Sequence, residues 1–116
     1  MTGTGRNLTD QLRFREAVSL FLNLSGHDDA QPKPMRPKIS ESIGVSASDV
    51  RGVPGWFLAC SSRTTLRLSD DLATAHAEAS DGEHVAVVQH LRARPLSDSL
   101  VVMRLSDFAA ITAPSP

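Results

Sequence analysis

The sequence predicts an α/β fold in which helices flank one mixed sheet. Apolar residues recur at helical spacing in residues 14–22 and again in residues 72–79. Short apolar and β-branched runs at residues 85–91 and 100–104 are typical of strands. The dipeptide Pro54-Gly55 separates two further extended stretches. Read in order, these segments give helix, strand, strand, helix, strand, strand, helix, which predicts a sandwich around a single sheet.

Length and composition fit one globular domain. The 116 residues are 41% hydrophobic and 22% charged, and no apolar run approaches the roughly 20 residues that cross a membrane. The first ten residues are polar and do not resemble a signal peptide. A single Cys60 can form no internal disulfide, which agrees with a reducing compartment. We therefore expect a cytoplasmic or virion-associated protein with no membrane partner.

The first helix is expected to follow a flexible arm formed by residues 1–8. Thr9 or Asp10 can cap it, since a side-chain oxygen there accepts hydrogen bonds from free amides. Its apolar stripe comprises Phe14, Ala17, Val18, Phe21 and Leu22. Ser25-Gly26 should end it.

Basic residues gather in two segments that contain no acid. Residues 31–38 hold three prolines, which predicts an extended segment, with a possible strand at residues 39–45. The first segment, residues 31–38, contains Lys33, Arg36 and Lys38. The second segment, residues 50–68, contains Arg51, Arg63 and Arg67. Residues 70–83 contain five acidic residues and no Lys or Arg. The net charge of the whole chain is −1. The basic segments could therefore contact phosphates or could pair with the acidic segment.

The middle of the chain predicts a hairpin. In Val53-Pro54-Gly55-Trp56, proline presets its own φ and glycine can take the positive φ of a type II turn, between strands at residues 48–53 and 56–61. A helix should begin at Ser69-Asp70-Asp71 and end at residues 80–82. The strands at residues 85–91 and 100–104 should be buried, and a short helix from Ser106 should close the chain.

The string Asp49-Val50-Arg51-Gly52-Val53-Pro54-Gly55-Trp56, the helix with Ala75 and the later strands at 85–88 and 100–103 carry a resemblance. Together they resemble the small Holliday-junction-resolvase-like members of the PD-(D/E)xK nuclease superfamily found in actinobacteria and their phages. The resemblance covers residues 49–111 and implies a restriction-endonuclease-like three-layer sandwich. It also implies pairing of identical copies.

The resemblance implies an active site in which two catalytic residues have been replaced. In that family an Asp at the position of Asp49 and a Glu on the following strand hold Mg²⁺, and a Lys two residues later orients water. Ala59 stands at the Glu position and Ser61 at the Lys position. A shift of one residue gives Leu58 and Cys60, which is no better. Because losing one preorganised group typically costs about 10² to 10³ in rate, we expect only a remnant site and no cofactor.

Three hypotheses for function follow. The first is a non-cleaving nucleic-acid-binding module that contacts DNA through the six basic residues named above. The second is a structural or assembly component of an actinobacteriophage virion or another complex, bound to protein partners or identical copies. The third is an endonuclease using Mg²⁺ or Mn²⁺ with relocated groups: Asp49 with Glu16, Asp10 or Glu78 as carboxylates, and Arg63 or Lys38 as the cation.

Other motifs give little support to further chemistry. His84, His90 and Cys60 lack the spacing of a zinc site, and no nucleophile elbow or glycine-rich phosphate loop is present. Trp56 is expected to anchor the core beside the turn, although it could stack on a base.

Overall fold

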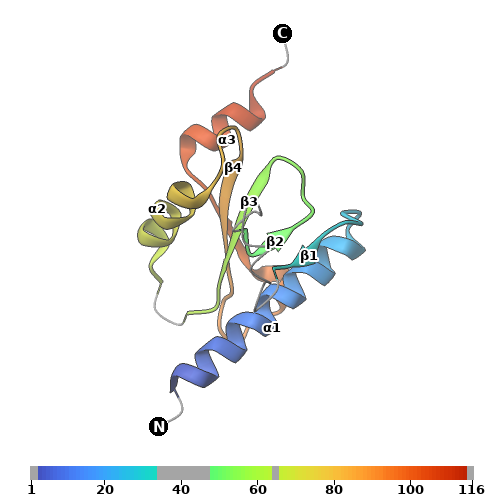
Figure 1. Cartoon of the computed structure of the whole chain (residues 1–116), viewed down its shortest axis with the longest axis vertical. Helices are drawn as coiled ribbons and strands as arrows, with labels where there is room; N and C mark the ends of the chain where they lie inside the picture. Colours follow the sequence, from blue (N-terminus) through green and yellow to red (C-terminus); the bar gives the residue numbers. More distant parts are fainter. Residues whose placement is uncertain (1–2, 34–47, 64–65, 115–116) are drawn as a thin grey trace, which may run out of the picture.

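A mixed five-stranded sheet, in the order β1-β2-β3-β4-β5, forms the centre of this computed structural model (Figure 1). The structure describes residues 3–33, 48–63 and 66–114. The strands are β1 Gln31–Pro32, β2 Val50–Arg51, β3 Trp56–Ser61, β4 His84–Gln89 and β5 Leu100–Val102. The helices are α1 Gly3–Leu24, α2 Leu68–Glu78 and α3 Leu105–Thr112, with a short 3₁₀ turn η2 at Leu96–Asp98.

Strands β3 and β4 are parallel, and every other neighbouring pair is antiparallel. Helix α2 makes the connection between β3 and β4. The carboxyl ends of β3 and β4 therefore lie at the same end of the sheet, where Ser61 is in register with Gln89. The α/β architecture with one mixed sheet, predicted from the order of elements, is confirmed.

The alternation of side chains along β3 and β4 places α1 and α2 on opposite faces of the sheet (Figure 1). On one face, Leu58 and Cys60 of β3 pack with Phe14 and Val18 of α1. On the other face, Phe57 packs with Ala75 of α2. The core thus consists of two apolar clusters separated by the sheet, with the fully buried residues of β4 contributing to both.

Helix α1 begins earlier than predicted. It starts at Gly3, so the prediction of an arm over residues 1–8 is wrong from residue 3 onward. No proline interrupts this stretch, and extending an existing helix adds one hydrogen bond for each residue that is fixed. The other end agrees with the prediction, because the helix stops before Gly26, whose φ is +109°.

The proline-rich segment contributes a short edge strand. Pro32 lies in β1, where a residue without an N–H is tolerated because the outer edge needs no donor. Arg36, Lys38 and the strand predicted at residues 39–45 lie outside the described residues.

The hairpin has the predicted turn. Trp56 donates its backbone N–H to the Val53 carbonyl at 3.1 Å, and Gly55 has φ +81°. Strand β3 matches the predicted bounds, whereas β2 is shorter than predicted. Strand β2 ends at Arg51, directly before Gly52, which has φ +83° and lies against the Asp29 backbone.

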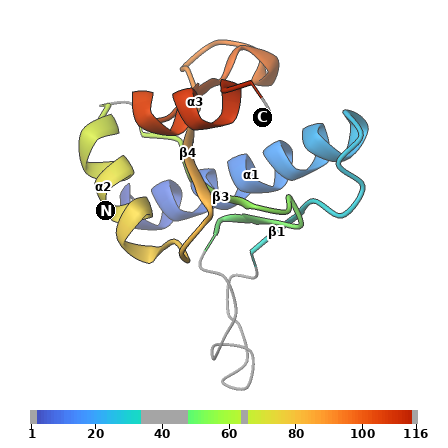
Figure 2. The same ribbon diagram turned by 90° about the horizontal axis from the view of Figure 1, so that it is seen from above.

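Strand β5 and helix α3 form the opposite side of the molecule from β1 (Figure 2). The prediction that residues 100–104 are buried is wrong, since the side chain of Val101 is 60% exposed at the edge of the sheet. Helix α3 has no buried residue and is tied to α2 by His76 Nε2, which lies 3.2 Å from Asp107 Oδ2. Among the described residues, none of the helices combines the length and apolarity that membrane crossing requires.

Candidate functional site

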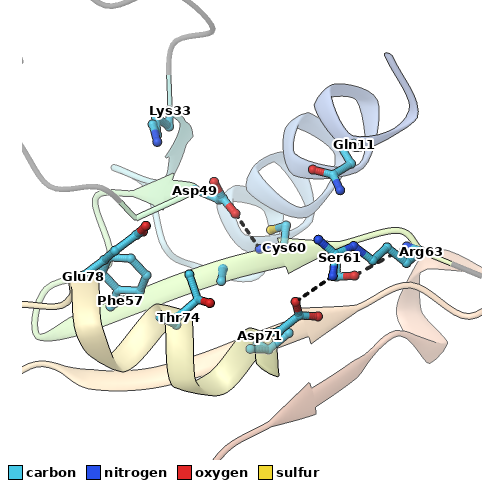
Figure 3. A pocket seen from close by; sticks show the side chains of 13 residues that line it. Gln11, Lys33, Asp49, Phe57, Cys60, Ser61, Arg63, Asp71, Thr74 and Glu78 are labelled. Atoms are coloured by element: carbon cyan, nitrogen blue, oxygen red, sulfur yellow. Dashed lines mark hydrogen bonds and ion pairs between the residues drawn. The ribbon is translucent and has the colours of Figure 1, made fainter. Parts of the chain in front are cut away.

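Asp49 directly precedes β2, and both of its carboxylate oxygens are engaged. Its Oδ1 accepts from Arg15 Nη2 of α1 at 2.9 Å. Its Oδ2 accepts from the Cys60 backbone N–H at 2.8 Å, as Figure 3 shows. The backbone N–H of Asp49 also donates to the Leu58 carbonyl. The Asp49 side chain therefore adds a hydrogen bond between the segment before β2 and strand β3, next to the Val50–Leu58 pair. It also connects these strands to α1 through Arg15.

The three positions that the sequence identified as a remnant active site lie around one cavity. Its volume is about 220 Å³, and Figure 3 shows its lining. Asp49, Ala59 and Ser61 all contribute to that lining, so the structure brings them together. Lys33 lines it from beside β1, and Asp71, Thr74 and Glu78 line it from α2. We call this space the remnant cavity.

The donor set of the remnant cavity does not fit a divalent cation. Ala59 offers a methyl group, and the Ser61 hydroxyl lies 3.4 Å from the Arg63 backbone N–H. Asp49 is already neutralised by a guanidinium. Within residues 3–33, 48–63 and 66–114, no cluster of three or more His, Cys, Asp or Glu is arranged to hold a metal ion.

The carboxylates considered as relocated ligands are scattered. Glu16 is exposed on α1 and does not line the remnant cavity, whereas Glu78 does. Asp10 lines a different cavity on the other side of Arg63. The structure therefore does not place Glu16 beside Asp49.

The predicted phosphate-binding residues do not form one patch. Arg63 pairs with Asp71 at 3.0 Å, so one basic residue does bind the acidic segment. Lys33 lies in the remnant cavity, Arg51 is half-buried on β2, and Arg67 is exposed before α2. Among the described lining residues of the remnant cavity, three carboxylates outnumber the two basic side chains of Lys33 and Arg63.

Positive charge gathers instead in a second cavity of about 620 Å³. It lies where β3 and β4 end and is closed on one side by α1, and we call it the strand-end cavity. Among the described residues, its basic lining residues are Arg13, Arg63, Arg92 and His90, and its one carboxylate is that of Asp10. Sequence reasoning missed Arg13 and Arg92. Arg92 could have been found, because it directly follows a predicted strand.

Cys60 is a buried thiol rather than a nucleophile. Its pKa is raised from 9.0 to about 12, mainly by burial and to a smaller extent by the Asp49 charge, while the Arg15 charge acts in the opposite direction. The side chain therefore remains a neutral thiol at neutral pH and packs in the cluster beneath α1.

Comparisons of the chain with protein-family models, with curated proteins and with solved structures found no match.

Proposed function

We propose that this protein is a non-cleaving nucleic-acid-binding module with a nuclease-like fold. The observation that carries the proposal is the state of Asp49. Arg15 supplies the positive charge at its carboxylate, and the neighbouring positions Ala59 and Ser61 offer no second carboxylate and no amine. These positions therefore lack the second metal-binding carboxylate and the water-orienting amine that metal-dependent cleavage uses, although the strands and helices around them are present.

The arrangement of elements supports a restriction-endonuclease-like sandwich. Helices α1 and α2 cover opposite faces of a mixed sheet, and the remnant cavity lies between α1, the start of β2, strand β3 and α2. These positions of the helices and the sheet agree with the three layers that the resemblance implies. Because one fold hosts many activities, function has to be argued from charged side chains rather than from this likeness.

The charged side chains favour phosphate contacts at the strand-end cavity. Arg13 and Arg92 are exposed, and within the described part of the chain neither guanidinium has a hydrogen bond or ion pair. Guanidinium groups bind phosphate oxygens in a fork, and such contacts give nucleic-acid binding without any metal.

Fluorescence anisotropy with labelled duplex, branched and single-stranded DNA across a salt series tests the proposal. Binding should weaken steeply with salt, and Arg92→Gln should reduce the slope of log K against log[salt] by about 0.7 to 0.9 for each lost phosphate contact. Arg104→Gln is the matched control, because Arg104 is exposed and lines neither cavity. Salt-independent binding, or cleavage of these DNAs with Mg²⁺ or Mn²⁺, would overturn the proposal.

A second candidate function is a structural role in an assembly. It rests on large apolar side chains that the fold leaves uncovered on β5 and α3, among them Val101, Leu105 and Phe108, which are 60%, 80% and 52% exposed. Exposed apolar surface of this kind marks contacts with other proteins or with identical copies. Sedimentation velocity over a concentration range tests it, and a strict monomer would exclude assembly from identical copies.

A further inference from the structure

We propose that the strand-end cavity binds a single unpaired nucleotide, with its phosphate on Arg13 and Arg92 and its base beside His90. The inference deepens the proposed function, since it names the chemical class that this cavity takes. It differs from that function in a testable way, because it requires recognition of one nucleotide and not only of a polymer's charge.

The position of the cavity is the first argument. In open α/β sheets, ligands bind outside the carboxyl ends of parallel strands, where the connecting loops diverge. Strands β3 and β4 are the one parallel pair in the described sheet. Ser62 and Arg63 follow β3, His90 and Arg92 follow β4, and all four line the cavity.

The charge of the lining is the second argument. Of the residues that the structure describes, three with guanidinium groups line the cavity, against one carboxylate, that of Asp10. Arg63 is held by Asp71, but Arg13 and Arg92 have no such partner within the described residues. They approach from different elements, α1 and the segment after β4, so an anion between them would be bound from two sides.

The apolar part of the lining is the third argument. His90 packs against Phe14 with ring centroids 5.1 Å apart, and Ala17, Ala93 and Leu96 complete the wall. A lone phosphate would leave this wall uncovered. A volume of about 620 Å³ lies within the range of roughly 300 to 1,000 Å³ typical of sites for small organic ligands, so a base and sugar can be held as well.

The cavity is also preorganised. The Gln89 side chain is fully buried, and its Nε2 donates to the backbone carbonyls of Arg63 at 3.1 Å and His90 at 2.9 Å. The His90 backbone N–H donates in turn to the Ser61 carbonyl at 2.9 Å. These bonds fix the ends of both strands together. The basic side chains therefore project from a backbone that needs little ordering on binding.

Base pairing sets the substrate class. A base within a duplex is stacked and paired, so it cannot enter a cavity unless it is first unstacked and unpaired, which is unfavourable. The cavity should therefore take a free nucleotide or an unpaired nucleotide of a single strand. A phosphorylated strand end and an internal unpaired position share this chemistry, and oligonucleotides with and without a terminal phosphate distinguish them.

Isothermal titration calorimetry with inorganic phosphate, a nucleoside and the corresponding nucleoside 5′-monophosphate tests the inference. The monophosphate should bind at least about tenfold more tightly than either fragment, because it uses both parts of the lining. Arg92→Gln and Arg13→Gln should each weaken the monophosphate by about 10- to 100-fold, the range for a hydrogen bond to a charged group. His90→Ala should weaken the monophosphate and leave phosphate binding unchanged. Arg104→Gln should change nothing, and thermal melting of each variant checks the fold.

Each outcome decides between the two proposals. Equal affinity for phosphate and the monophosphate, or equal effects of Arg92→Gln and Arg104→Gln, would overturn the inference. If DNA polymers bind with steep salt dependence while the monophosphate does not bind, this inference fails and the proposed function stands. If the monophosphate binds but no DNA polymer does, the proposed function fails and the cavity is a site for free nucleotides.

Discussion

The Arg15 guanidinium lies 2.9 Å from the Asp49 carboxylate, and this ion pair joins α1 to the start of β2. Both side chains are mostly buried, with 14% and 19% of their surfaces exposed. The second oxygen of the carboxylate accepts the Cys60 amide of β3. Asp49 thus connects three elements of the fold, which is a structural role for a residue that the sequence alone identifies with a metal site.

Asp49→Asn should lower the free energy of unfolding by about 1.5 to 3 kcal/mol, the range for hydrogen bonds to charged groups. The physical reason is that Arg15 would remain mostly buried without its counter-charge. Arg15→Gln should cost a similar amount, and the double variant should cost clearly less than the two single changes together. Urea unfolding of the four proteins measures this coupling. Additive costs would show that the pair contributes nothing specific.

Divalent cations should leave the melting temperature unchanged, because the Asp49 oxygens are engaged by the guanidinium and the amide. A cation that bound the folded state would stabilise it by about 2.7 kcal/mol at a hundred times its Kd. Thermal melts with and without Mg²⁺ and Mn²⁺ measure this. A metal-dependent rise in melting temperature that disappears in Asp49→Asn would contradict our assignment of the site.

Gly52 and Gly55 should respond differently to substitution by alanine, although both have positive φ. A Cβ on Gly52 would lie 1.8 Å from the Asp29 carbonyl oxygen, whereas a Cβ on Gly55 would meet nothing within 4 Å. Gly55→Ala should cost about 1 to 2 kcal/mol from the left-handed backbone alone. Gly52→Ala should cost distinctly more, because two backbone segments must move apart. Equal losses in urea unfolding would show that this close approach does not form in solution.

Local dihedral preferences explain what the sequence could predict. Pro54 and Gly55 determine their own turn, so the hairpin and the bounds of β3 were predictable from four residues. The Arg15–Asp49 pair was not predictable, because no spacing rule links a residue on a helix with one at the start of a distant strand. The exposure of Val101 also depends on long-range order, since apolar composition does not say which strand forms the edge of the sheet.

Cys60 should react slowly with thiol reagents in the folded protein, since the thiolate is the reactive form and burial raises the pKa to about 12. The raised pKa also affects stability. Above the unfolded pKa of 9.0, the unfolded chain loses a proton that the folded chain keeps, so stability should fall as pH rises from about 9 toward 12. Labelling with a chromogenic disulfide at pH 8, with and without urea, measures the first effect. Equal rates in both conditions would contradict the buried position.

Gln89 should be the polar residue that contributes most to the shape of the strand-end cavity. Its amide donates to the carbonyls that follow β3 and β4, while its own Oε1 has no hydrogen-bond partner within the described part of the chain. Gln89→Leu keeps a similar volume but leaves two carbonyls without their donor, so unfolding should become easier by about 1 to 3 kcal/mol.

The matched control for Gln89 is Gln31→Leu on exposed β1, which should stay within about 0.5 kcal/mol of the original protein. Because Gln89 acts through backbone position, Gln89→Leu should also raise amide exchange at Arg63 and His90 more than at Trp56, at the other end of β3. Hydrogen exchange measured by NMR separates this local loosening from a general loss of stability. Uniform acceleration along β3 would mean that Gln89 stabilises the core as a whole and does not specifically hold the strand ends.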